Sequence, residues 1–185
     1  MYALTYTVTT DQERLEYFLA TRSEESFRLL CDGLTPRLLR YFLARSCDRV
    51  TAEELTQDVL FTLYRRAYTI RDSRLFQAWL FRVAHNALLQ RLRSARRRIQ
   101  TVRQGDTGCD AWESAVLADP PDSGLEQALA ALEPQDREIL LLRFVEGLDY
   151  REIAAALSVP VGTAKWRVFN SKLKLAAELR KGEER

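Results

Sequence analysis

Apolar residues recur at every third or fourth position along most of the chain, and they alternate with polar residues over almost none of it. This recurrence predicts amphipathic helices, because residues three and four positions apart share one face of a helix. The one alternating stretch, residues 2–8, is too short to found a β-sheet. We therefore expect an all-α protein. Helices are predicted at about residues 11–22, 24–46, 51–67, 75–99, 125–132, 134–146, 149–157 and 161–181.

Three of the predicted helices also carry a start signal. In each, a Thr or Asp precedes a Glu by three positions, which is the spacing of a capping box. The two side chains of a capping box accept hydrogen bonds from backbone N–H groups that the first helical turn leaves without partners. The pairs are Thr10 and Glu13, Thr51 and Glu54, and Asp149 and Glu152.

The helical pattern stops between residues 104 and 124. This stretch contains three glycines, two prolines and several aspartates, a composition that is typical of a linker. A short turn is expected inside it, at 112–117. The sequence thus predicts two small helical domains, at residues 1–103 and 125–185, joined by a linker at 104–124.

The second domain contains the pattern of a helix-turn-helix. Pro160 ends the helix at 149–157, because a proline ring blocks a helical hydrogen bond, and a longer helix follows at 161–181. A short helix, a tight turn and a second helix form the arrangement whose second helix enters the major groove of DNA. The core of this domain is expected to hold Ile153, Ala154 and Leu157, with Ile139, Leu140, Leu142 and Phe144 of the preceding helix.

A helical wheel separates the surfaces of the helix at 161–181. The inward face is predicted to comprise Ala164, Val168, Ser171 and Leu175. Cationic residues lie beside this face and can contact phosphate groups, which position a helix without reading sequence. They are Lys165, Arg167 and Lys172. Thr163 lies at the helix start, where backbone N–H groups favour an anion. A solvated helix that ends a bundle is the alternative, and the Pro160 turn in front of the helix favours DNA binding.

Charge is distributed unevenly along the chain, although the net charge is only +2. Residues 91–103 contain six arginines and no acid, and residues 165–181 are basic except for Glu178. Basic segments of this kind suit a polyanion such as nucleic acid. Residues 53–58, in contrast, are acidic.

The helix at 51–67 presents an acidic stripe that includes an aromatic residue. The stripe comprises Glu54, Gln57, Asp58 and Phe61, and it lies on a different face from the apolar residues Leu55 and Val59. An acidic face can bind a basic protein partner, or it can simply be solvated. The pattern alone favours the solvated face.

The helix at 75–99 has an apolar face and a basic one. Phe76, Trp79, Leu80, Val83 and Ala87 share the apolar face, so Trp79 is predicted to lie in the core. The opposite face carries Arg82, His85, Leu89, Arg93 and Arg96, with Asn86 at its edge. Basic and amide side chains along one side of a helix favour a nucleic-acid ligand. The polar loop before the helix, residues 70–75, is a weaker candidate site for an extruded base.

Enzyme chemistry and metal binding find little support. His85 is the only histidine, and no acid or second ligand accompanies it in the sequence. Cys31, Cys47 and Cys109 are odd in number and lack CxxC spacing, which argues against a disulfide framework and against a zinc site. No apolar run is long enough to span a bilayer, and residues 1–10 lack a signal-peptide pattern. We expect a cytoplasmic protein without cofactors.

Taken together, the motifs resemble those of bacterial RNA polymerase sigma factors of the small extracytoplasmic-function (ECF) type. Residues 52–59 (AEELTQDV) look like the helix that binds the polymerase clamp, and residues 76–86 (FQAWLFRVAHN) look like the −10 element segment. Residues 132–139 (LEPQDREI), 146–154 (EGLDYREIA) and 162–165 (GTAK) look like the −35-binding domain. The resemblance covers most of the chain in the family's order.

The resemblance implies a role for each group of residues. Glu53, Glu54, Gln57, Asp58 and Phe61 would face the clamp helices of core RNA polymerase. Arg71, Asp72, Ser73 and Arg74 would capture a flipped base of the −10 element, and Arg82, His85, Asn86 and Arg93 would hold the DNA around it. Thr163, Lys165, Trp166, Arg167 and Lys172 would engage the −35 duplex. The implied partners are core RNA polymerase, promoter DNA and an anti-sigma protein.

Some positions depart from the family's pattern. Gln90 stands where an Asp is usual, and Trp166, Phe169 and Leu173 replace small, polar or basic residues on the outward face of the second helix. These three side chains either contact thymine methyl groups or form a docking patch for another protein. A stand-alone helix-turn-helix regulator is the rival function, but it would leave the motifs at 52–59 and 76–86 unexplained.

Overall fold

The computed structural model describes residues 10–45, 47–102 and 124–183, and every regular element within these ranges is helical. The all-α prediction is therefore confirmed. The long elements are α1 (Asp11–Thr21), α2 (Glu24–Ala44), α3 (Arg49–Arg66), α4 (Phe76–Val102), α5 (Gly124–Ala130), α6 (Pro134–Leu140), α7 (Tyr150–Leu157) and α8 (Val161–Glu183). Short turns of 3-10 helix, η1 (Ala67–Thr69) and η2 (Ser73–Leu75), precede α4, and a π-helical turn, η3 (Leu141–Val145), follows α6.

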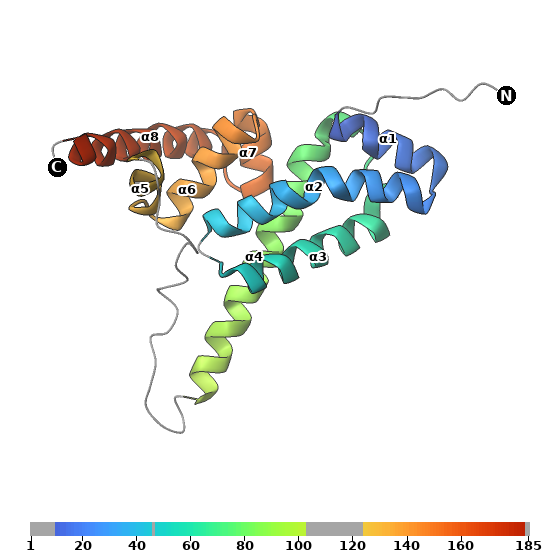
Figure 1. Ribbon diagram of the computed structural model, residues 1–185, viewed down its shortest axis with the longest axis horizontal. Helices are drawn as coiled ribbons and strands as arrows, with labels where there is room; N and C mark the ends of the chain where they lie inside the picture. The colour runs from blue at the N-terminus through green and yellow to red at the C-terminus, as the bar shows by residue number, and fades with distance from the viewer. Residues whose placement is uncertain (1–9, 46, 103–123, 184–185) are drawn as a thin grey trace.

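The first four helices form one packed unit, drawn from blue to green in Figure 1. Helix α2 packs between α1 and α3, and α3 packs against α4. Their buried side is lined by large apolar residues that water does not reach, including Leu30, Leu38, Phe42, Leu63 and Phe81. The far part of α4 extends away from the other helices (Figure 1).

Helices α5 to α8 form the second unit, in which α8 packs on α5, α6 and α7. The helix-turn-helix lies within it. The turn forms because Ser158 adopts a left-handed conformation, with φ of 55°, and Pro160 then directs the chain into α8. The predicted core residues Ile153, Ala154, Leu157, Ile139, Leu140 and Leu142 are all buried.

Phe144 was predicted to join this core and instead is 60% exposed. The prediction was wrong because it continued an α-helical wheel through residues 141–145, where the chain forms the π-helical turn η3. The backbone N–H of Glu146 bonds to the carbonyl of Leu141, five residues earlier. This wider turn rotates Phe144 away from the face that an α-helix would give it.

One of the three predicted capping boxes was also wrong. The boxes at Thr10 and Asp149 are present, but α3 begins two residues before Thr51. Its cap is Asp48, whose carboxylate accepts hydrogen bonds from both the backbone N–H of Thr51 (2.9 Å) and its hydroxyl (2.7 Å). An Asp side chain accepts a hydrogen bond from the backbone N–H of the third helical residue as readily as a Thr side chain does. Asp48 precedes Thr51 by about one helical turn and takes this role.

Most of the predicted linker, and the turn predicted inside it, lie outside the described residues. Gly124, its last residue, is the first residue of α5, and α4 continues to Val102. The two units also contact each other directly, because α4 packs along α7 and α2 packs against α6. Their buried apolar residues belong to a single cluster. None of the described helices has the length and apolar character needed to cross a membrane.

Candidate nucleic-acid interface

Helix α4 buries one side in the first unit and exposes a basic side. Phe76, Leu80, Phe81, Ala84 and Leu88 are buried. Trp79, predicted to lie in the core, is half-buried and packs against it, and its ring stacks on that of Phe76 with centroids 6.5 Å apart. On the other side Arg82, Asn86 and Arg93 are exposed. These three predicted DNA-binding residues are therefore brought to one accessible surface.

His85 differs from its neighbours on this surface. Its Nδ1 lies 3.0 Å from Oε1 of Glu138 on α6, and the hydroxyl of Tyr41 donates a hydrogen bond to the same oxygen. The guanidinium of Arg45 lies 3.5 Å from the other carboxylate oxygen. Burial alone would raise the pKa of Glu138, but His85, Arg45 and Tyr41 outweigh it and hold the pKa below its ordinary value. His85 thus has a partner acid, contributed by the second unit.

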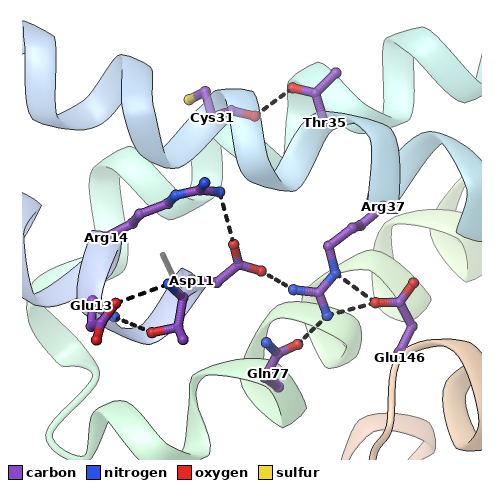
Figure 2. A network of polar contacts seen from close by, with 9 residues as sticks. Asp11, Glu13, Arg14, Cys31, Thr35, Arg37, Gln77 and Glu146 are labelled. Carbon is purple, nitrogen blue, oxygen red and sulfur yellow. Dashed lines mark hydrogen bonds and ion pairs between the residues drawn. The ribbon is translucent and has the colours of Figure 1, made fainter. Parts of the chain in front are cut away.

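A second buried carboxylate joins the same two units. Glu146, just after η3, accepts from Arg37 at 2.6 Å and from Arg40 at 2.9 Å, both on α2. Arg37 also contacts Asp11 of α1 and the side-chain amide of Gln77 on α4 (Figure 2). One arginine therefore ties three helices of the first unit to the start of the helix-turn-helix segment.

The loop before α4 is fixed in place by contacts with α1 and within itself. Ser73 bonds to Gln12 (3.1 Å) and to the carboxylate of Glu16, both on α1, so its position is fixed from outside the loop. Arg74 pairs with Asp72 at 3.0 Å, and its hydrogen bonds lower the pKa of that carboxyl. Arg71 is exposed. The four predicted residues do form one short segment, packed onto α1 through Ser73.

The acidic stripe of α3 is exposed along its length. Glu53 pairs with Arg49 (2.9 Å) on the same helix, and Glu54 pairs with Arg91 (3.1 Å) on α4. Gln57 and Asp58 are exposed, and Phe61 leaves 61% of its surface to solvent with only the Arg65 guanidinium over its ring. Further apolar residues, Val50 and Tyr64, lie exposed on the same helix. A face that mixes acids with uncovered aromatics fits a protein partner better than solvent alone.

The helix-turn-helix is fixed by specific polar contacts. Asp149 caps α7 through hydrogen bonds from the backbone N–H groups of Arg151 (2.7 Å) and Glu152 (2.8 Å). The ring of Tyr150 lies under two cations, Arg143 with its Cζ at 4.9 Å and Lys165 with its Nζ at 5.8 Å. The start of α8 is thereby joined to the start of α7.

The wheel predicted for α8 is confirmed. Ala164, Val168 and Ser171 are buried, and Leu175 is half-buried. Lys165, Trp166 and Lys172 are exposed, while Thr163 and Arg167 lie half-buried at the edges. No acidic residue occurs between Val161 and Ala177. The predicted −35 residues therefore lie on the outer side and the edges of α8, where Lys165, Arg167 and Lys172 flank the exposed Trp166.

Comparison with known proteins identifies the family of both units. Residues 32–98 match the family Sigma-70 region 2, and residues 123–175 match the family Sigma-70, region 4. The ECF RNA polymerase sigma factor SigL of Mycobacterium tuberculosis is 31% identical over 144 residues, which cover 76% of this chain and 81% of SigL. The chain belongs to the ECF-type sigma factors. It is accordingly a promoter-recognition subunit that binds RNA polymerase, and not an enzyme.

Two further proteins are similar to this sigma factor, one in sequence and one in fold. The ECF sigma factor BldN of Streptomyces coelicolor is 30% identical over 161 residues, which cover 82% of this chain but only 60% of BldN. The sigma factor RpoE from Bartonella quintana, solved with the anti-sigma factor NepR, superposes with a TM-score of 0.66 at 24% identity, covering 84% of this chain and 98% of RpoE. At that identity the structure supports the fold alone.

Some residues of this interface could not be found from the sequence of the sigma factor. Glu138 and Glu146 lie inside quoted motifs, but nothing in the sequence indicated that Glu138 meets Tyr41 or that Glu146 meets Arg37. Asp136, which holds α8 to α6, falls inside a motif but carried no predicted role. In residues 10–45, 47–102 and 124–183, no three metal-ligating side chains gather into a cluster.

Proposed function

We propose that this sigma factor holds a promoter at two points, with residues 1–103 on the −10 element and residues 125–185 on the −35 element. The linker at 104–124 would connect the two through the polymerase. The observation that carries the proposal is the pairing of surfaces: α4 and α8 each expose a cationic side, and each lies in one of the two matched sigma-70 regions.

The α3 face is the proposed contact with core RNA polymerase. Its residues are Glu53, Glu54, Gln57, Asp58 and Phe61, and they would lie against the clamp helices of the polymerase. Exposed carboxylates select a basic partner and guide its approach, while an uncovered aromatic side chain supplies the apolar centre of a protein interface. Phe61 is the residue of this face best suited to that centre, because most of its ring is uncovered.

The −10 element is proposed to meet α4 and the loop before it. Arg71, Asp72, Ser73 and Arg74 would receive a base flipped out of the duplex, and Arg82, His85, Asn86 and Arg93 would hold the DNA beside it. Extruding a base costs a few kcal/mol, and binding in a preformed loop offsets that cost without covalent chemistry. Anchoring of Ser73 to Gln12 and Glu16 supports such a preformed loop.

The −35 duplex is proposed to lie on α8. Thr163 and the N-terminal backbone of the helix would meet phosphate, and Lys165, Arg167 and Lys172 would flank the groove. Trp166 would face the bases. The absence of acidic residues between Val161 and Ala177 supports this assignment, because a carboxylate on that surface would repel the DNA backbone.

We further expect an anti-sigma protein to regulate the chain. We also expect the chain to act in the cytoplasm, where polymerase and chromosome are found. The first expectation is supported by RpoE of Bartonella quintana, which shares the fold and was solved with the anti-sigma factor NepR.

A reconstitution experiment tests the proposal. The full chain is mixed with purified core polymerase, and co-elution and transcript start sites are measured on genomic DNA. We expect co-elution and a defined set of start sites. Asp58→Arg should weaken co-elution, whereas Asp32→Arg, which reverses the charge of an exposed acid on α2, should not. A chain that neither co-elutes with core nor directs specific starts disproves the proposal.

A further inference from the structure

The outward face of α8 is apolar at its centre. Trp166 and Phe169 are each 63% exposed, and Leu173 is 54% exposed. They lie directly opposite the buried residues of the same helix, so none of them contributes to the core. Their spacing covers about 10 Å along the helix axis, at a rise of about 1.5 Å per residue. This length of exposed apolar surface on a helix is unusual unless it contacts something.

Cations border the apolar centre on both sides. At about 100° per residue, Lys165 and Lys172 fall on one side of the Trp166–Phe169–Leu173 line. Arg167 and Lys174 fall on the other side, although Lys174 also contacts Asp136 at 2.6 Å. A helix lying in the major groove has its centre over the base edges and its two sides near the two phosphate backbones. The pattern of α8, apolar in the centre and cationic at both sides, matches that geometry.

We infer that Trp166, Phe169 and Leu173 read thymine methyl groups in the major groove of the −35 element. This inference rests on the proposed binding of α8 to that element. The C5-methyl of thymine is the apolar group that the major groove offers, so an apolar helix centre selects A·T pairs. Asn170, half-buried at the edge of the same face, supplies the complementary polar contact, because an Asn side chain pairs with the N6 and N7 groups of adenine.

An acidic, amphipathic protein helix is the other ligand that such a face can take. The helix-turn-helix favours DNA as the ligand. The turn at Ser158 and the contact between the starts of α7 and α8 leave the first turns of α8 facing outward, and Trp166 and Phe169 lie there. An experiment that changes only the DNA can distinguish a DNA ligand from a protein ligand.

The experiment uses the full chain assembled with core polymerase, on a promoter located by start-site mapping. Each thymine of the −35 region is replaced in turn by deoxyuridine, which lacks the C5-methyl group and keeps every hydrogen-bonding group. We expect the affinity to fall about fourfold for each methyl group that the helix contacts, which is the transfer free energy of one CH₂ group expressed as a ratio. Deoxyuridine upstream of this region should change nothing.

Protein variants then assign the effect. Trp166→Ala and Phe169→Ala should bind thymine and deoxyuridine duplexes equally well, whereas Phe144→Ala, which removes a similarly exposed aromatic outside α8, should keep the preference. Equal affinity of the wild type for both duplexes overturns the inference while leaving −35 binding intact. A preference that survives in Trp166→Ala and Phe169→Ala overturns it too, because other residues then read the methyl groups. Failure to locate any promoter disproves the proposed function itself.

Discussion

At the scale of single residues, one buried hydroxyl group joins α8 to α6. Ser171 lies fully buried on the packed face of the helix, where its Oγ donates to Oδ1 of Asp136 at 2.6 Å. The other oxygen of Asp136 accepts from Lys174 at 2.6 Å. Burial would raise the pKa of Asp136, but these two hydrogen bonds and the charges of Lys174 and Arg167 together lower it. The carboxylate thus stays charged where a neutral acid would hold the helix less firmly.

Asp136→Ala should lower the free energy of unfolding by about 1–3 kcal/mol, because it leaves the buried Ser171 hydroxyl without an acceptor. Chemical denaturation followed by circular dichroism measures the change. In the double variant with Ser171→Ala, much of the loss should be recovered, since both polar partners are then gone. If the two substitutions are simply additive, the hydrogen bond between them does not contribute to stability.

Phosphate contacts made by α8 should make DNA affinity depend on salt concentration. Replacing Lys165 and Arg167 by Ala should flatten the plot of log affinity against log salt by about 2, since each lost phosphate contact removes about 0.9 from the slope on duplex DNA. Fluorescence anisotropy with a promoter duplex, measured at several salt concentrations, gives the slope. Lys181→Ala is the matched control, because this lysine lies at the far end of α8 and pairs with Glu178 at 2.6 Å. An unchanged slope in the double variant would show that this part of α8 does not touch phosphate.

At the scale of elements, the predicted start of a helix was right at α7 and wrong at α3. Asp149 and Glu152 form a capping box, and α7 begins where that pair predicted. At α3 the predicted box at Thr51 and Glu54 was wrong, because Asp48, three residues earlier, caps the helix instead. Ala52, Leu55 and Val59 face the core whichever residue caps the helix, so apolar periodicity does not locate the helix start.

The cap of α7 makes a measurable contribution to the helix-turn-helix. Asp149→Ala should destabilise the protein by about 0.5–2 kcal/mol, since two backbone N–H groups lose their acceptor. Glu133→Ala is a close control, because Glu133 occupies the same position at the start of α6 but its side chain makes no capping hydrogen bond. The midpoint of thermal unfolding compares the two variants. An equal effect at both sites would mean that lost charge, rather than the lost cap, explains the result.

The candidate surfaces were predictable to different degrees. Periodicity places Trp79 in the core and Trp166 outside it, because each lies on a regular helix whose apolar side is clear. The same reasoning fails at Phe144, where a π-helical turn breaks the period without any sequence signal. It also fails for His85, whose partner Glu138 lies 53 positions away and on another unit. Contacts between units depend on tertiary structure, which periodicity does not contain.

At the scale of the whole molecule, buried carboxylates join the two units. Glu138 and Glu146 come from the second unit, and their cationic and hydroxyl partners come from α2 and α4 of the first. Removing one member of a buried ion pair leaves an uncompensated charge, at a cost of about 3–5 kcal/mol. The association of the units therefore depends on the charge of these two acids.

Acid should separate the two units. The pKa of Glu138 is lower in the folded state than its ordinary value of 4.5, so its stabilising contribution is complete above that pH. The contribution is lost as the pH falls through the lowered pKa. In the separated state Glu138 binds a proton more tightly, so acid favours that state. Small-angle X-ray scattering should show the radius of gyration rising in acid before circular dichroism detects loss of helix.

Glu138→Gln should show the larger radius already at pH 7, since it removes the charge and keeps the size of the side chain. Glu54→Gln alters an exposed ion pair within the first unit and should leave the radius unchanged. A compact Glu138→Gln variant at pH 7 would show that apolar packing of α4 on α7 suffices to hold the units together.

The His85 side chain is only 14% exposed, because its imidazole is packed at the unit boundary with Nδ1 on Glu138. If α4 holds the −10 strand as proposed, DNA and the second unit compete for the same side chain, and their binding free energies are coupled with opposite sign. Such coupling is reciprocal. If contact between the units lowers the affinity for −10 DNA by some factor, binding of −10 DNA lowers the equilibrium constant for contact between the units by the same factor. A protein that separates the units would tighten promoter binding without touching DNA, and one that clamps them together would silence the promoter without covering it.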